Sequence, residues 1–253
     1  MLKTSLYALL GCLFLSSACS RLAPEKAEVT VAAAANLMDV FQQMGPRFEA
    51  QTGIHPVFSF GATAQLTQQI ENAAPFDVFT AADSQHVAEV DEKHLLVPGS
   101  RAVYAHGVLA LWIPQPTGNP IRRVEDLASP AIHVIAIANP KLAPYGQAAV
   151  EALQRSHVWD QVESKVVYAE NINIAKQYGI SHNADAVFTA YSLVLKESGN
   201  VIRVDESLHE PILQSLGILA NSKHPDAAKK FVDFLLTGEG RSMLDAYGYQ
   251  TGR

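Results

Sequence analysis

The sequence predicts an α/β protein whose parallel strands are covered by helices on both faces. Short runs rich in β-branched and aromatic residues alternate with helical patterns along nearly the whole chain. Such alternation is typical of strand–helix–strand units, in which helices cover a mostly parallel sheet. The chain has 253 residues, which is long enough for one large domain or two moderate lobes.

Strands and helices are expected in strict alternation over most of the chain. Strands are expected from residue 29 into the following alanines, and at 57–60, 77–81, 108–112, 132–137, 166–168 and 186–188. Helices are expected at 37–48, 65–72, from Ser84 to before Pro98, at 146–154, 226–236 and 241–246, and after the strands at 166–168 and 186–188. Trp112 lies in an apolar strand and is expected in the core.

The N-terminal residues have the pattern of a secretory signal. A basic start is followed by an apolar stretch over 6–15 and by small residues over 16–18. The stretch is too short to span a bilayer, so we expect a signal peptide over 1–18. Residues 19–28 are polar, contain proline and lack periodicity, as in a flexible tether.

Cys19 stands where bacterial lipoproteins carry their lipidated cysteine. Its setting resembles a lipobox, although Ser16 holds the place of the usual leucine. We expect lipidation at Cys19, with plain cleavage after Ala18 as the alternative. Cys12 and Cys19 are the only two cysteines, so the folded part is expected to contain neither a disulfide nor thiolate chemistry.

Charge and hydropathy narrow the classes of partner. The formal net charge is −6 and no basic run occurs, so nucleic acid is not expected as a partner. No segment after the signal is long and apolar enough to cross a bilayer. Contact with a membrane is therefore expected only through the lipid anchor, and the protein is expected to be a monomer.

The stretch 29–41 is the most informative part of the chain. A short strand runs through alanines into Asn36, a favoured N-cap residue, and then into a helix. Unpaired N–H groups and the positive end of the helix dipole make such a junction an anion site. An ordinary strand–turn–helix is the alternative for this segment taken alone.

Three other junctions share this character. Thr63 follows a strand and small residues, and is expected to cap a helix and to offer its hydroxyl to a ligand. Tyr145 follows Pro144 at a first helical turn and adds a phenol. Asn171 is expected to cap a helix and expose the N–H groups of Ile172 and Asn173. A simple cap or a packed loop is the alternative at each junction. Ligands of open α/β sheets bind beyond the carboxyl ends of the strands.

Particular motifs at these junctions resemble the molybdate-binding periplasmic component of ABC transporters. They are Ala33-Ala-Ala-Asn36-Leu, Phe60-Gly-Ala-Thr63 and Gln69-Ile-Glu-Asn-Ala-Ala-Pro-Phe-Asp77-Val-Phe-Thr-Ala-Ala-Asp83. The resemblance implies a two-lobe periplasmic binding protein fold of type II. Its sheets would be mixed and mostly parallel, with flanking helices and a hinge of two crossovers.

The resemblance also implies the lobe boundaries and the site. Lobe 1 would contain 26–105 and 213–253, lobe 2 would contain 106–212, and the chain would cross near 104–107 and 210–212. Contacts to molybdate or tungstate are implied for Asn36, Thr63, Tyr145 and the backbone of Ile172, with Ala35, Ala64 and Ala190 as additional candidates. Some family members carry a tyrosine where this chain has Ala190. The ligand is the only bound group implied, without a cofactor, and the partner is a membrane permease reached from the periplasm.

Other functions remain open at this stage. Sulfate is also a doubly charged tetrahedral oxyanion, and another solute, such as an organic anion or a metal chelate, is a further alternative. An exported α/β hydrolase or transferase would use Asp83 or Glu170 as a base, but no activated nucleophile pattern accompanies them. Asp83 is expected instead to cap the helix that starts near Ser84 or to fix a lobe contact, and Glu170 to lie at a lobe contact or at the rim.

Overall fold

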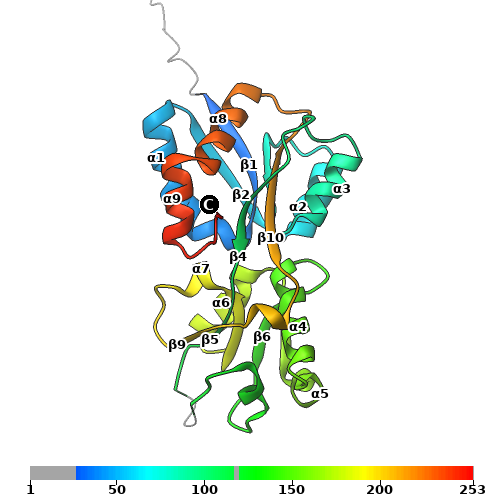
Figure 1. Ribbon diagram of the computed structural model, residues 1–253, viewed down its shortest axis with the longest axis vertical. Coiled ribbons are helices and arrows are strands. Elements are labelled where there is room, and N and C mark those ends of the chain that lie inside the picture. Colours follow the sequence, from blue (N-terminus) through cyan, green and yellow to red (C-terminus); the bar gives the residue numbers. More distant parts are fainter. Residues whose placement is uncertain (1–26, 117–119, 253) are drawn as a thin grey trace, which may run out of the picture.

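The computed structural model describes residues 27–116 and 120–252. Two five-stranded sheets, each flanked by helices, form two lobes along the long axis of the molecule (Figure 1). The predicted signal peptide, Cys19 and nearly all of the predicted tether lie outside the described residues. The tether ends before residue 28, because Glu28 is already the first residue of β1. Within the described ranges, no helix is long and apolar enough to cross a bilayer.

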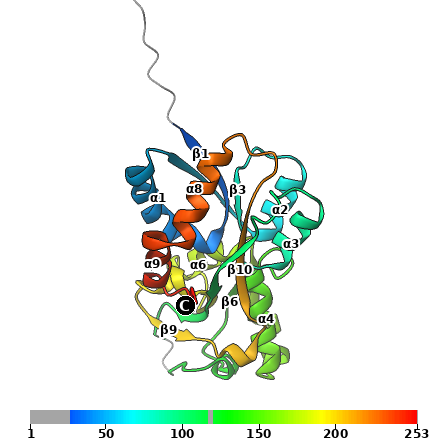
Figure 2. The ribbon, with the colours of Figure 1, turned by 45° about the horizontal axis from the view of Figure 1, so that its top comes forward.

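The first sheet has the strand order β2-β1-β3-β10-β4. Its strands are β2 (His55–Gly61), β1 (Glu28–Ala34), β3 (Val78–Thr80), β10 (Ile212–Ile218) and β4 (Ala102–Gly107). β1 pairs in parallel with β2 and β3, whereas β10 runs antiparallel to β3 and β4. One face packs on α1 (Met38–Thr52), α8 (Pro225–Leu236) and α9 (Gly238–Ala246), and the other on α2 (Thr63–Glu71) and α3 (Gln85–Glu92), as Figure 2 shows.

The second sheet repeats this plan with the order β7-β6-β8-β5-β9. Its strands are β7 (Val166–Ala169), β6 (Ile135–Ala138), β8 (Ala186–Ala190), β5 (Leu109–Ile113) and β9 (Asn200–Arg203). β6 is parallel to both neighbours, whereas β5 is antiparallel to both of its own. The helices around it are α4 (Pro144–Arg155), α5 (Trp159–Val162), α6 (Ile172–Ile180) and α7 (Tyr191–Val194). Short 3-10 turns are η1 (Ala35–Leu37), η2 (Val124–Ala128), η3 (Glu163–Lys165) and η4 (Glu206–Leu208).

The chain passes between the two sheets twice. It leaves β4 at Gly107 and enters β5 at Leu109, and it leaves β9 at Arg203 and enters β10 at Ile212. Both crossings lie close to the predicted positions, and the two-lobe fold with mixed sheets is confirmed. The described sheets contain as many antiparallel as parallel pairs, because β10 and β5 each run antiparallel to two neighbours. The exact lobe boundaries stay a prediction.

Several elements differ from the expectation for identifiable reasons. Strands β4, β9 and β10 lack a plain apolar run, and β10 buries the polar side chains of Gln214 and Ser215 where a core strand would carry aliphatic residues. Helix α3 ends at Glu92, well before Pro98, because His94 adopts a left-handed backbone with φ 58°. Trp112 is buried in the second sheet, as predicted.

Candidate functional site

Four strand-to-helix junctions surround one small cavity between the lobes. The first lobe contributes the ends of β1 and β2 and the second residue after β3, and the second lobe contributes the starts of α4 and α6. The lining residues are Ala34, Ala35, Asn36, Gly61, Ala62, Thr63, Ala82, Ala143, Pro144, Tyr145, Asn171 and Ile172. None of them carries a charged side chain, so any attraction for an anion comes from neutral donors.

The cavity is too small for an organic solute as the lobes stand. The positions open to the centre of a water-sized sphere occupy about 10 Å³, roughly the space that one water molecule requires. Any ligand larger than a water molecule, a tetrahedral oxyanion included, therefore requires the lobes to move apart from this arrangement. A compact ion that contacts both lobes stabilises the closed arrangement over an open one.

The cavity contains most of the residues expected from the sequence. Asn36, Thr63, Tyr145 and Ile172 all line it, together with Ala35. Ala64 does not line it, and its N–H donates to the carbonyl oxygen of Leu142 across the lobes at 3.1 Å. Ala190 also lies outside the lining, fully buried at the end of β8 and paired with Leu109. Ala82 was missed, although it follows a strand in the same small-residue pattern.

Helix starts supply main-chain donors to the cavity. Asn171 caps α6 as predicted, and its side-chain oxygen accepts from the N–H groups of Asn173 and Ile174, both at 3.0 Å. The N–H of Ile172 is the first of α6 and has no acceptor within the helix. Pro144 occupies the first position of α4, which leaves the N–H of Tyr145 as the first donor of that helix.

Asn36 is not the helix cap that its sequence position predicts. It is the middle residue of η1, with Ala34 at the N-cap, and α1 begins only at Met38. Its Nδ2 donates to Gln214 Oε1 at 2.8 Å and to Tyr249 Oη at 3.1 Å, while its buried Oδ1 has no partner among the described residues. The Asn36 Nδ2 group is therefore engaged within the first lobe, whereas Oδ1 has no described partner.

Thr63 also departs from the predicted capping role. It is the first residue of α2, after the N-cap Ala62, and its Oγ accepts from the N–H of Ala82 at 3.1 Å. Among the described residues, the Thr63 hydroxyl donates to no acceptor. A hydroxyl has a single hydrogen. Because Thr63 Oγ accepts from Ala82 and donates to no described residue, that hydrogen remains available to an oxyanion in the cavity.

We expect replacement of Thr63 by valine to weaken anion binding by about tenfold, the value of one hydrogen bond to a charged acceptor. Thr63→Val keeps the shape but removes the donor and leaves the buried N–H of Ala82 unpaired, so the melting temperature also falls. Thr63→Ser is the matched control, because it keeps the hydroxyl. Calorimetric titration measures the effect, and equal affinities for the two variants would exclude a role for the hydroxyl.

Tyr145 supplies the second hydroxyl. Its side chain is almost fully buried, and its Oη accepts from Gln214 Nε2 at 2.8 Å. Burial raises the pKa of Tyr145 well above that of a free tyrosine. The phenol therefore keeps its proton throughout the physiological pH range and remains a neutral donor.

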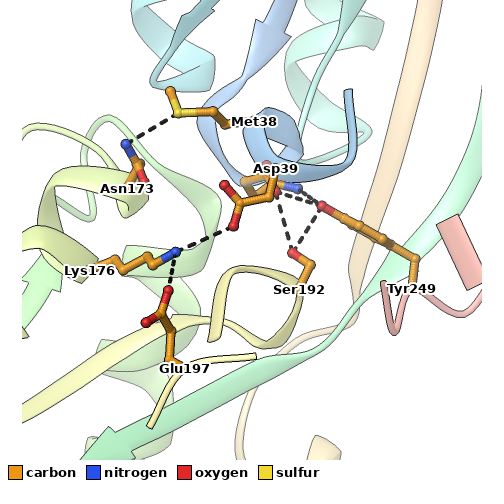
Figure 3. A network of polar contacts seen from close by, with 8 residues as sticks. Met38, Asp39, Asn173, Lys176, Ser192, Glu197 and Tyr249 are labelled. Atoms are coloured by element: carbon orange, nitrogen blue, oxygen red, sulfur yellow. Dashed lines mark hydrogen bonds and ion pairs between the residues drawn. The ribbon is translucent and has the colours of Figure 1, made fainter. Parts of the chain in front are cut away.

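Polar contacts join the lobes beside the cavity (Figure 3). The ammonium group of Lys176 on α6 lies 3.3 Å from Asp39 on α1 and 2.9 Å from Glu197 of the second lobe. Asn173 Nδ2 lies 3.5 Å from the sulfur of Met38. The contacts from Asn173 and Lys176 hold α6, which begins at Ile172, against the first lobe.

A further contact between the lobes is the hydrogen bond that Gln65 Nε2 donates to Glu170 at 2.9 Å. Gln65 lies on α2 of the first lobe and Glu170 in the loop before α6 of the second. Glu170 thus makes the lobe contact expected from the sequence. Asp83 accepts from the N–H of His86 at 3.0 Å and from its ring at 2.7 Å, which is the capping role expected for it.

The two carboxylates at Lys176 offer a matched pair of variants. Asp39→Asn breaks the contact between lobes, whereas Glu197→Gln breaks one within a lobe, and the two acids are exposed to similar extents, 35% and 33%. We expect Asp39→Asn to weaken ligand affinity about fivefold, the upper range for a partly exposed ion pair. Glu197→Gln is expected to leave affinity unchanged. Calorimetry compares them, and equal losses would show that Asp39 has no role in closure.

The comparisons with known proteins agree with this geometry. A family model described as "Bacterial extracellular solute-binding protein" matches residues 29–250. The chain belongs to this family. As an extracellular solute-binding protein, it acts outside the cytoplasm and belongs to a family of transport proteins rather than enzymes. Its two lobes and the cavity between them are the arrangement that such a protein requires.

Named relatives of this solute-binding protein cover nearly its whole length. The molybdate-binding protein ModA of Rhodobacter capsulatus is 37% identical over 228 residues, 88% of each chain. ModA of Azotobacter vinelandii is 38% identical over 231 residues, 90% of this chain and 91% of the relative. The solved structure of the Azotobacter vinelandii periplasmic molybdate-binding protein aligns with a TM-score of 0.85 at 29% identity, covering 89% of this chain and all of that one.

Proposed function

We propose that this protein captures molybdate or tungstate in the interlobe cavity and delivers it to the permease of an ABC transporter. The observation that carries the proposal is the cavity itself, lined by neutral groups, where the hydroxyls of Thr63 and Tyr145 each accept one hydrogen bond and keep a hydrogen for a ligand. The relatives named as molybdate-binding support the choice of ligand.

The donor chemistry explains why a dianion suits this cavity. Neutral N–H and O–H donors form hydrogen bonds about twice as strong when the acceptor is charged. The helix starts at Thr63 and Ile172 add the positive ends of their dipoles. A fully ionised tetrahedral oxyanion offers acceptors in every direction, so it pairs with donors from both lobes at once.

One observation favours a second ligand class. Asn36 Oδ1 is buried without a partner among the described residues, and Asn36 lines the cavity. A protonated oxyanion such as hydrogen phosphate carries a hydrogen that this oxygen would accept. Sulfate is the other rival, because it shares the charge and shape of molybdate and differs in the length of its bonds to oxygen.

Calorimetric titration with a panel of oxyanions tests the proposal. We expect one molybdate or tungstate per chain and a much weaker response to sulfate and hydrogen phosphate. Binding should also raise the melting temperature, because the ligand stabilises the folded state. Sulfate or hydrogen phosphate binding as tightly as molybdate would overturn the assignment of the ligand.

Location and anchoring belong to the same proposal. We infer a monomeric periplasmic protein, tethered to a membrane through lipidated Cys19. Replacing Cys19 by alanine is expected to release the protein from membranes into the soluble fraction. If the signal is instead cleaved without lipidation, the same substitution would not change the distribution of the protein between membranes and the soluble fraction. The lobe division at 26–105 with 213–253 and at 106–212 describes the moving parts that would close on the ion.

A further inference from the structure

We propose that Gln214 is a positioning residue that holds Tyr145 as a hydrogen-bond donor toward the ligand cavity, which gives the site its preference for oxyanions without a proton. This inference rests on the proposed function and deepens it. Gln214 itself does not line the cavity, so it acts through Tyr145.

The contact between the two side chains fixes the direction of the phenol. Gln214 is fully buried on β10, and its Nε2 donates to Tyr145 Oη at 2.8 Å. Among the described residues, Tyr145 Oη has no other partner. Since a phenol has one hydrogen, accepting from Gln214 leaves that hydrogen for a ligand. An oxyanion accepts it, whereas a P–OH group facing the same hydrogen would be a donor against a donor.

The Asn36 amide on the far side of Gln214 sets the orientation of the Gln214 amide. Gln214 Oε1 accepts from Asn36 Nδ2 at 2.8 Å. It also lies 2.7 Å from Tyr104 Oη, whose single hydrogen it shares with the carbonyl oxygen of Ala81 at 2.9 Å. With the Gln214 amide rotated by 180°, its NH₂ would oppose the NH₂ of Asn36, and its oxygen would take the hydrogen of Tyr145. The contact from Asn36 therefore keeps the Gln214 oxygen away from the phenol.

The backbone at Gly107 provides an independent observation. A Cβ atom at this position would lie 2.2 Å from Tyr145 Oη and 2.4 Å from Gln214 Nε2. Such distances are impossible without movement, so only glycine leaves space for this hydrogen bond. Gly107 ends β4 at the first crossover, and the bond itself joins α4 of the second lobe to β10 of the first. Closure of the lobes and orientation of the phenol are thus a single event.

A double-variant cycle separates this role from a merely structural one. Molybdate affinity is measured by calorimetry for wild type, Gln214→Met, Tyr145→Phe and the double variant, with the melting temperature of each. Methionine matches glutamine in size and lacks the donor. We expect each single variant to lose about tenfold in affinity, the factor for one hydrogen bond to a charged group. The double variant should stay within about threefold of Tyr145→Phe, because Gln214 has no phenol left to orient.

The selectivity of Gln214→Met provides a second readout. Release of the phenol should reduce the preference for molybdate over hydrogen phosphate, which a general loss of stability would not change. If Gln214→Met does not fold, Gly107→Ala disrupts the same bond, and its loss in affinity should shrink in the Tyr145→Phe background, where the nearest atom is gone.

The possible failures are distinguishable. Wild-type protein that binds none of the oxyanions overturns the proposed function together with this inference. Wild-type protein that binds molybdate, with losses that multiply to about a hundredfold in the double variant, overturns the role of Gln214 alone. So does a Gln214→Met variant with unchanged affinity.

Discussion

Asn36→Asp is expected to abolish oxyanion binding near neutral pH. The substitution places a carboxylate among the residues that line the cavity, in a position that is 1% exposed. A negative charge about 5 Å from a dianion costs on the order of 6 kcal/mol at an effective dielectric constant near 20. The carboxylate also removes the Nδ2 that donates to Gln214 and Tyr249. We therefore expect affinity to fall by more than about a thousandfold.

Asn36→Ala separates the charge from the lost hydrogen bonds. It removes the amide but keeps the main-chain N–H, and we expect a loss of about tenfold only. The two variants also differ in how their affinity depends on pH. A buried carboxylate has a raised pKa, so acidification should restore part of the binding to Asn36→Asp and leave Asn36→Ala unchanged. Titrations at several pH values measure this, and equal losses in both variants would show that the position is remote from the anion.

Ile172→Pro is expected to show that a main-chain hydrogen holds the ligand. Ile172 is the first residue of α6, where proline fits because its missing N–H has no partner within the helix. The preceding Asn171 is extended, with φ −147° and ψ 175°, as the residue before a proline must be. We expect affinity to fall by up to about a hundredfold, or roughly 3 kcal/mol for a lost bond to a charged acceptor.

Ile172→Ala is the control for this substitution. It shortens the same buried side chain, which packs in the core of the second lobe, but keeps the N–H. The alanine variant should lose stability without losing most of its affinity, whereas the proline variant should lose affinity. Calorimetry measures the affinity of both variants, and thermal unfolding measures their stability. A proline variant that binds as tightly as the alanine variant would show that the N–H of Ile172 does not bind the ligand.

Local pattern was sufficient to predict the α/β class and the strand-to-helix junctions, whereas the two lobes were implied by the family resemblance. Alternation of strands and helices, and small residues where strands end, place Asn36, Thr63, Tyr145 and Ile172 at one edge of two sheets. The prediction of Ala190 came only from the resemblance, and the structure places it outside the lining.

The side-chain contacts that orient the groups of the site could not be predicted from the sequence. Gln214 is 178 residues from Asn36 and 69 from Tyr145, so no local spacing indicates their contact. Because Gln214 interrupts the apolar pattern of β10, the sequence did not predict a buried strand there. Lys176 resembles a solvent-facing helix residue until the fold brings Asp39 and Glu197 to it. The prediction that Asn36 caps a helix was wrong, because Asn36 lies inside a 3-10 turn that precedes α1.

We propose that neutral donors from the two lobes hold a doubly charged oxyanion without a contact from a cationic side chain. A crystal structure with bound molybdate, located by the anomalous scattering of molybdenum, tests it most directly. We predict one metal-centred peak in the interlobe cavity, with oxygens in hydrogen-bond contact with Thr63 Oγ, Tyr145 Oη and the N–H of Ile172. A peak beside a lysine or arginine, or outside the cavity, would contradict it.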